Sequence, residues 1–120
     1  MNKIANLTQH NATEEQVAAG VFDLVGEDRK MLVKLLTFAT LPTKEEIEER
    51  AKAIAMLVMG CRAAMIGGAP YLMPALERAL KEEGVMPLYA FSERVSVEEL
   101  LADGSIRKIN VFKHVGWVEA

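Results

Sequence analysis

The feature that most constrains the fold is a short apolar run followed by two glycines and an amphipathic helix. Ala63–Ile66 carries no charge, and Gly67 and Gly68 follow it directly. Apolar residues then recur at i, i+3, i+4, i+7 and i+8 across Leu72–Leu80, which is typical of one helix face. Pro74 falls in the first turn, where a missing N–H costs little. The pattern predicts a buried strand, a tight turn and a helix in succession.

Composition indicates one ordinary domain spanning residues 1–120. The chain is 51% apolar and 26% charged, which is enough to build a core without metal or disulfide staples. Cys61 is the single cysteine, so an internal disulfide or a multi-cysteine zinc site is excluded, and a plain thiol in a reducing compartment is expected. No run approaches the ~20 apolar residues that span a membrane, and no apolar signal region opens the chain. We therefore expect a cytoplasmic protein without a membrane partner and without a cofactor.

The net charge of −3 bears on the class of ligand. A protein that binds duplex nucleic acid usually carries a general basic field, and this chain has none. Duplex nucleic acid is therefore not an expected partner. A site for an anion would have to be local, built from a few groups.

Turn and cap signals divide the rest of the chain. Capping boxes at residues 13–16 and 43–46 predict two helix starts, and a further helix is expected over residues 27–38. Strands are expected at residues 3–8, 63–66 and 87–91, with a proline tolerated at the first position of the last. Alternating residues at 95–98 and 106–111 flank Asp103-Gly104, which predicts a hairpin, and residues 114–118 suggest one more strand.

Strands separated by helices imply right-handed crossovers and a parallel sheet. The predicted fold class is therefore α/β, a Rossmann-like three-layer domain with a mainly parallel sheet and a C-terminal antiparallel hairpin. The order of the strands does not follow from the sequence.

Three polar clusters follow the predicted strands, at the carboxyl ends where such sheets bind ligands. The glycine turn also precedes a helix N-terminus, whose free amides suit an anion such as phosphate. His10 and Arg94 are the predicted catalytic residues. The predicted ligand-binding residues are Thr8, Gln9, Asn11, Gly67, Gly68, Ala69, Ser92 and Ser96.

Each cluster also has a purely structural interpretation. His10 could be a loop histidine, and Asn11 could simply cap a helix. Arg94 could form one of the weak surface ion pairs that are common on hairpins. The glycine turn could connect strand and helix without any ligand. His114 becomes a candidate only if the last strand lies beside the first.

No known catalytic motif is present, and two distant histidines do not define a metal site. The candidate groups could instead bind a phosphodiester: Arg94 and helix amides would stabilise charge on its oxygens, and His10 could move a proton. If the ligand were RNA, its own 2′-hydroxyl could be the nucleophile, and no metal would be required.

Three segments together resemble a known family. They are Ile4–His10 followed by Thr13–Gln16, then Phe91–Ser96, and finally Phe112–Val118. In this pattern and in size the chain is similar to the small, single-domain CRISPR-associated ring-nuclease-like proteins. The resemblance implies a Rossmann-like homodimer that binds cyclic oligoadenylate across its two-fold axis and, in some members, cuts the ring without metal. A related family of bacterial or phage proteins is the other interpretation of the same pattern.

The leading hypothesis is a nucleotide or cyclic oligonucleotide binding protein that acts further as a metal-independent RNA phosphodiesterase. The alternatives are a non-catalytic module for a small ligand on the same face and a dimeric interaction protein without one. The last alternative is motivated by seven methionines and by Tyr71, Leu72 and Met73 at the start of a helix, because soft apolar side chains suit adaptable interfaces.

Overall fold

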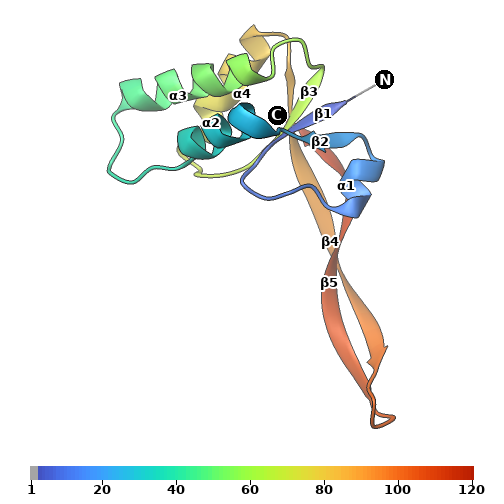
Figure 1. Ribbon diagram of the computed structural model, residues 1–120. Coiled ribbons are helices and arrows are strands. Elements are labelled where there is room, and N and C mark those ends of the chain that lie inside the picture. The colour runs from blue at the N-terminus through green and yellow to red at the C-terminus, as the bar shows by residue number, and fades with distance from the viewer. Residues whose placement is uncertain (1–2) are drawn as a thin grey trace.

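The computed structural model describes residues 3–120, which form four helices and one five-stranded sheet (Figure 1). The sheet order is β2-β1-β3-β4-β5; the first four strands are parallel, and β5 is antiparallel to β4. The strands are β1 (Ile4–Leu7), β2 (Val21–Asp23), β3 (Ala63–Ile66), β4 (Met86–Leu100) and β5 (Ile106–Glu119). The helices are α1 (Glu14–Ala18), α2 (Gly26–Leu36), α3 (Lys44–Leu57) and α4 (Met73–Glu82). The α/β class, the mainly parallel sheet and the C-terminal hairpin are confirmed.

The predicted helix starts lie where the capping signals place them. Thr13 and Gln16 form a reciprocal capping box at α1, since each side chain accepts a hydrogen bond from the other's backbone N–H. Thr43 Oγ1 accepts from Glu46 N at 3.1 Å at the start of α3. These bonds satisfy amides that have no partner inside the helix, which is why the chain turns helical there.

The helices divide between the two faces of the sheet. α2, α3 and α4 stack together on one side, and α1 lies apart from them near β2 (Figure 1). The topology accounts for this division. The β1-to-β2 connection runs toward one edge of the sheet, whereas the β2-to-β3 and β3-to-β4 connections run toward the other edge. Because all of these crossovers are expected to be right-handed, connections that run in opposite directions lie on opposite faces of the sheet. Between β1 and β3 the direction of winding therefore reverses.

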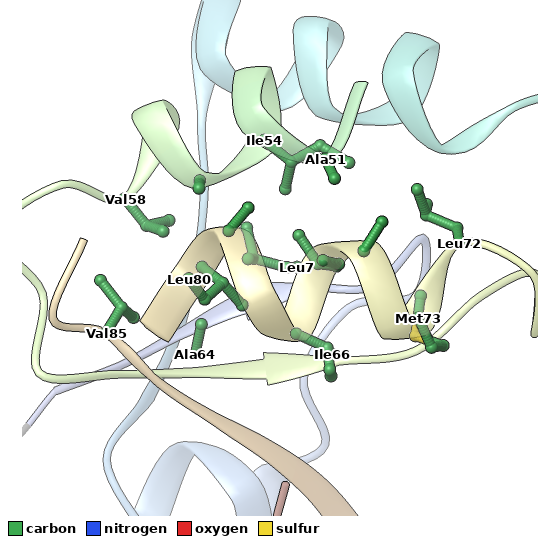
Figure 2. Close-up of a cluster of buried hydrophobic side chains, with 14 of the residues drawn as sticks. Leu7, Ala51, Ile54, Val58, Ala64, Ile66, Leu72, Met73, Leu80 and Val85 are labelled. Carbon is green, nitrogen blue, oxygen red and sulfur yellow. The ribbon is translucent and has the colours of Figure 1, made fainter. Parts of the chain in front are cut away.

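The core lies between the sheet and the α2–α4 layer. Alternate residues of β1 and β3 point into it, because successive side chains of a strand face opposite sides. Figure 2 shows Ile66 from the sheet below α4 and Ile54 from α3 above it, with Leu7 of β1 in the same cluster. Leu72 and Met73 belong to this core as well, so they do not form the exposed interface of the interaction-protein hypothesis; Tyr71 alone of that trio is exposed.

Two strand predictions were wrong. β2 was missed because it has only three residues and lacks a run of alternation. The strand predicted to end at Phe91 continues to Leu100, so the predicted loop Ser92–Arg94 is part of β4. Ser92–Arg94 belong to an exposed part of β4, and an exposed strand carries polar side chains much as a loop does. The sequence alone therefore does not distinguish the two.

β4 and β5 continue past the rest of the sheet as a two-stranded arm (Figure 1). Beyond Leu88, β5 is the only described strand that pairs with β4. The arm lengthens the molecule to 57 Å and raises the radius of gyration to 17.0 Å, against about 14 Å for a compact chain of this length. At its tip, the Asp103 carboxylate accepts hydrogen bonds from Ser105 N and Oγ, and these lower the pKa of Asp103.

No described helix is both long enough and apolar enough to cross a membrane.

The packing of α4 against the sheet is expected to dominate stability. Leu76 is fully buried in the core, whereas Leu41 is 95% exposed. We expect Leu76→Ala to lower the free energy of unfolding by about 2–5 kcal/mol, because it removes buried methyl groups and leaves a cavity. The matched variant Leu41→Ala should change it by less than about 0.5 kcal/mol. Urea denaturation followed by circular dichroism measures both, and equal effects would contradict this account of the core.

Candidate functional site

A cavity of about 380 Å³ opens at the carboxyl ends of β1 and β3, where the winding of the sheet reverses. In open α/β sheets this position, the topological switch point, is the usual place for a ligand. Its walls come from the turn after β1, the start of α1, the end of β3 with its glycine turn, and the first third of β4. The lining residues are Thr8, Gln9, His10, Asn11, Thr13, Gln16, Met65, Ile66, Gly67, Gly68, Tyr89 and Ala90.

Two of the three predicted clusters meet in this cavity. The turn Thr8–Asn11 and the pair Gly67-Gly68 line it together, as the sequence predicted for neighbouring strand ends. Ala69 lies just outside the lining. The part of the site prediction that rested on strands β1 and β3 is therefore consistent with the geometry.

The third cluster lies elsewhere. Ser92, Arg94 and Ser96 are on the arm and do not line the cavity. Arg94 is four residues beyond Ala90, or roughly 13 Å along an extended strand. Its guanidinium instead lies 5.5 Å from the centre of the Phe112 ring. The prediction failed here because β4 does not end where its polar residues begin.

Asn6 organises the turn that forms the polar wall. It is the one buried polar side chain of the described core and is fully inaccessible to solvent. Its Nδ2 donates to the His10 carbonyl at 2.7 Å and to Asp23 Oδ1 at 2.8 Å, and its Oδ1 accepts from Thr8 N at 2.9 Å and Thr8 Oγ1 at 2.7 Å. A buried amide costs free energy unless its donors and acceptor are satisfied, and here they all are. Sequence reasoning missed Asn6, which lies inside an apolar strand.

Asp23 and Arg29 hold the same turn from the β2–α2 side. Asp23 Oδ1 accepts a second hydrogen bond from Ala12 N at 3.0 Å. Arg29 Nη2 donates to the Gln9 carbonyl at 3.1 Å and to Asn11 Oδ1 at 3.3 Å. Arg29 Nη1 is buried and has no hydrogen-bond partner within residues 3–120. The cation that contacts the candidate site is therefore Arg29 rather than Arg94, and the sequence contained no motif that marked it.

The glycine turn packs closely on the turn after β1. A Cβ on Gly67 would lie 3.3 Å from the Thr8 methyl carbon, so a side chain there would press the two walls apart. Gly68 has φ +145°, a backbone conformation that residues with a side chain rarely adopt. Both glycines thus keep the two strand ends close together at the cavity.

The helix N-terminus does not reach this cavity, contrary to expectation. α4 begins at Met73, with Pro74 in its first turn as predicted. A turn closed by the bonds from Leu72 N to Ala69 O and from Met73 N to Pro70 O separates it from the glycines. No residue of this turn or of α4 lines the cavity. The dipole of α4 therefore gives no direct support for anion binding here.

Tyr89 forms the opposite wall and is tied to α4. Its hydroxyl donates to Glu77 Oε2 at 2.5 Å. Partial burial, together with the hydrogen bond to Glu77 and the negative charge there, raises the pKa of Tyr89 to about 12. The phenol therefore stays neutral across the physiological range, and Tyr89 presents an uncharged ring to the cavity.

The two histidines differ in position. The hydrogen bonds of His10 are made by its backbone, and this exposed residue lines the cavity. His114 is on β5, which pairs with β4 and not with β1, so the condition for its inclusion is not met. It contacts Trp117 with ring centres 4.6 Å apart. Within residues 3–120, no group of three or more His, Cys, Asp or Glu side chains could hold a metal ion.

Fold and cavity together define an α/β protein with a mixed five-stranded sheet and a candidate ligand site at its switch point. The chain belongs to the family described as "Uncharacterized protein MJ1673 family", whose model matches residues 2–118. A search of curated proteins and a search of solved structures each found no match. The family description states no activity, so an account of function has to rest on the geometry of the site.

The Asn6 network should make this residue unusually sensitive to substitution. We expect Asn6→Ala to lower the free energy of unfolding by at least about 2 kcal/mol, because Thr8 N and the His10 carbonyl would lose their buried partners. The control is Asn11→Ala, which removes one exposed hydrogen bond to Arg29 and should cost less than about 1 kcal/mol. Chemical denaturation measures both, and a near-neutral Asn6→Ala would contradict the role assigned to the network.

The raised pKa of Tyr89 predicts an alkaline loss of stability. In the unfolded chain the phenol ionises near its ordinary pKa of 10.0, whereas in the folded protein it ionises only near 12. Its contribution to stability is therefore complete below pH 10 and is lost as the pH rises to about 12. We expect Tyr89→Phe to show a smaller decline than the parent protein over that window in pH-dependent urea denaturation. Identical declines would show that Tyr89 is not shielded in this way.

Proposed function

We propose that the switch-point cavity binds a nucleotide. The nucleotide is either free or one unit of a cyclic oligonucleotide such as cyclic oligoadenylate. The observation that carries the proposal is the meeting of the Thr8–Asn11 turn and Gly67-Gly68 over one cavity. The two turns follow parallel strands whose connections lead away from the switch point in opposite directions, the arrangement that binds nucleotides in many α/β proteins.

The size and lining of the cavity support a ligand of this kind. A volume of about 380 Å³ lies within the usual range of small-molecule sites, roughly 300–1,000 Å³. Met65, Ile66 and Tyr89 also belong to the lining and add apolar surface beside the polar turn. That turn carries Gln9 and Asn11, whose side-chain amides can donate hydrogen bonds to sugar and phosphate oxygens, whereas the Thr8 hydroxyl already donates to Asn6 Oδ1.

The residues that line the cavity present no negative charge to a bound anion. None of the described lining residues is Asp or Glu, although the chain as a whole is acidic. Behind the polar turn, the Arg29 guanidinium supplies a positive charge and the Asp23 carboxylate a negative one, so these two residues together leave no net charge there. Gly67 and Gly68 have no side chains of their own, which lets their backbone N–H groups approach phosphate oxygens closely. This local arrangement takes over the role that the sequence assigned to Arg94 and the helix dipole.

Cleavage of a bound RNA is the finer part of the proposal. The ligand's own 2′-hydroxyl would attack the adjacent phosphorus, and the 5′-oxygen of the next nucleotide would leave. His10 would move the proton that the 2′-hydroxyl loses or the one that the 5′-oxygen gains. This step yields a 2′,3′-cyclic phosphate end and a free 5′-hydroxyl. A single imidazole without a nearby second acid or base supports binding more strongly than catalysis. A non-catalytic module that binds a small ligand on the same face is therefore the second candidate.

Two further expectations, the Rossmann-like fold class and the cellular compartment, agree with this proposal. The division of helices between both faces of the sheet supports a Rossmann-like three-layer interpretation of the fold. The free thiol of Cys61 supports a reducing compartment, and we propose the cytoplasm.

Isothermal titration with adenosine mononucleotides and with cyclic tetra-adenylate tests the binding site. We expect His10→Ala to weaken binding by about fivefold or more, because it removes a donor on the cavity wall but keeps the backbone bonds of the turn. The matched control is Arg94→Ala, which the geometry places outside the site and which should bind within about twofold of the parent protein. Loss of binding in Arg94→Ala with none in His10→Ala would overturn this site in favour of the arm.

The same samples distinguish binding from cleavage. Incubation with cyclic tetra-adenylate followed by chromatography should give linear products ending in a 2′,3′-cyclic phosphate, and His10→Ala should abolish them at saturating ligand. Saturable binding without linear products would favour the non-catalytic module.

A further inference from the structure

The middle of one face of the projecting arm is apolar, although no other element of the described residues covers it. Residues directly opposite in the two strands share a face, and alternate residues along each strand do as well. The register pairs Val95 with Val111 and Val97 with Ile109, so these four side chains form one patch, the arm strip. Val97 and Val111 remain 36% and 37% exposed. The arm strip thus places four β-branched side chains next to solvent.

At the height of the arm strip the opposite face of the ribbon is polar, whereas Phe112, Leu100 and Ile106 are exposed farther along that face. Ser96 pairs with Asn110, and Glu98 pairs with Lys108, at the same height along the arm. A general preference for β-strand residues would not by itself place the apolar side chains on one face and the polar side chains on the other. In a sheet, such alternation marks one side that is covered and one side that is solvated. A two-stranded ribbon on its own is also only marginally stable in water. The arm strip therefore has the pattern of a covered surface.

We propose that a second copy of this chain covers the arm strip, with the two arms packed face to face. The argument for this occupant is the distribution of charge on the face of the strip. Glu93 and Glu99 flank it on β4, whereas Lys113 and Arg107 flank it on β5. On this face β4 is therefore acidic and β5 basic, which makes the face complementary to a copy of itself. Glu99 and Arg107 already form an ion pair within the chain at 2.8 Å, so Glu93 and Lys113 contribute most to this complementarity.

The charges also select the arrangement of the two copies. A two-fold axis along the arm places β4 of one copy over β5 of the other, so that Glu93 meets Lys113 and Glu99 meets Arg107. An axis across the arm would place carboxylate over carboxylate and cation over cation, which is unfavourable. Aligned packing, with strands of the two layers within about 30° of each other, is also a preferred way to stack twisted sheets.

Shape at the base of the arm fits the same axis. Phe91 is 55% exposed and pairs across the ribbon with Gly116. A Cβ on Gly116 would meet nothing within 4 Å, so the space above this glycine is open. With the two-fold axis along the arm, the Phe91 ring of each copy lies over Gly116 of the other. The bulky Phe91 side chain then faces the open space above Gly116, and the two-fold axis produces this contact once on each side of the dimer.

Sedimentation equilibrium of the full chain over roughly 10–300 µM tests the proposal. We expect the parent protein to approach twice the 13.2 kDa of one chain. Val97→Asp, which places a charge on the arm strip, should raise the dimer dissociation constant by at least about tenfold. The matched control Ser96→Asp puts the same charge on the opposite face one residue away and should leave it within about threefold. Circular dichroism verifies that both variants stay folded.

A charge exchange separates the two possible axes. Glu93→Lys alone should weaken the dimer, since it brings two cations together, and the double variant Glu93→Lys/Lys113→Glu should restore it. If Glu93→Lys alone strengthened association, the axis would lie across the arm and the proposed packing would be overturned. A parent protein that stays monomeric throughout the range, or equal effects of Val97→Asp and Ser96→Asp, would overturn the self-association itself. The arm strip would then belong to a different protein partner.

Discussion

The buried side chain of Asn6 is the constraint on which the candidate site depends. Within a strand that otherwise points apolar groups into the core, it satisfies the backbone of the turn that follows and the carboxylate of the neighbouring strand. Because its donors and its acceptor are all used, the turn has one favoured geometry rather than several. The polar wall of the cavity is therefore a consequence of one saturated amide, with Asp23 and Arg29 supporting it from the adjacent elements.

The position of the cavity follows from the order in which the chain builds the sheet. The first crossover goes toward one edge and the later ones go toward the other, so the strands β1 and β3 end side by side with connections leading away from both. That divergence leaves a hollow which side chains of the two turns line but do not fill. Gly67 and Gly68 allow the turns to approach, since a Cβ on the first would press against Thr8. Topology thus provides the hollow, and local sequence determines its polarity.

Capping residues, glycine turns and helix periodicity predicted the helices and the parallel core strands well, because each of these signals acts locally. The two turns at the site were predictable for the same reason: each directly follows an apolar strand. Asn6 and Arg29 were not, since their roles depend on partners that only the folded chain brings near. Ser92 and Arg94 were misassigned because an exposed ribbon tolerates polar residues on a free face, and a polar run after an apolar strand has the same pattern as a loop.

β4 belongs to both candidate surfaces, and this joins them geometrically. Tyr89 and Ala90 line the cavity, and the arm begins at Phe91, where the pairing with β5 shifts register. The parallel strands direct their carboxyl ends, and hence the cavity, toward the side from which the arm extends. If two arms pack about an axis along their length, both cavities must open at the same end of the dimer, one on each side of the paired arms. A ligand with two-fold symmetry could then contact both polar turns, whereas a mononucleotide would occupy each cavity independently.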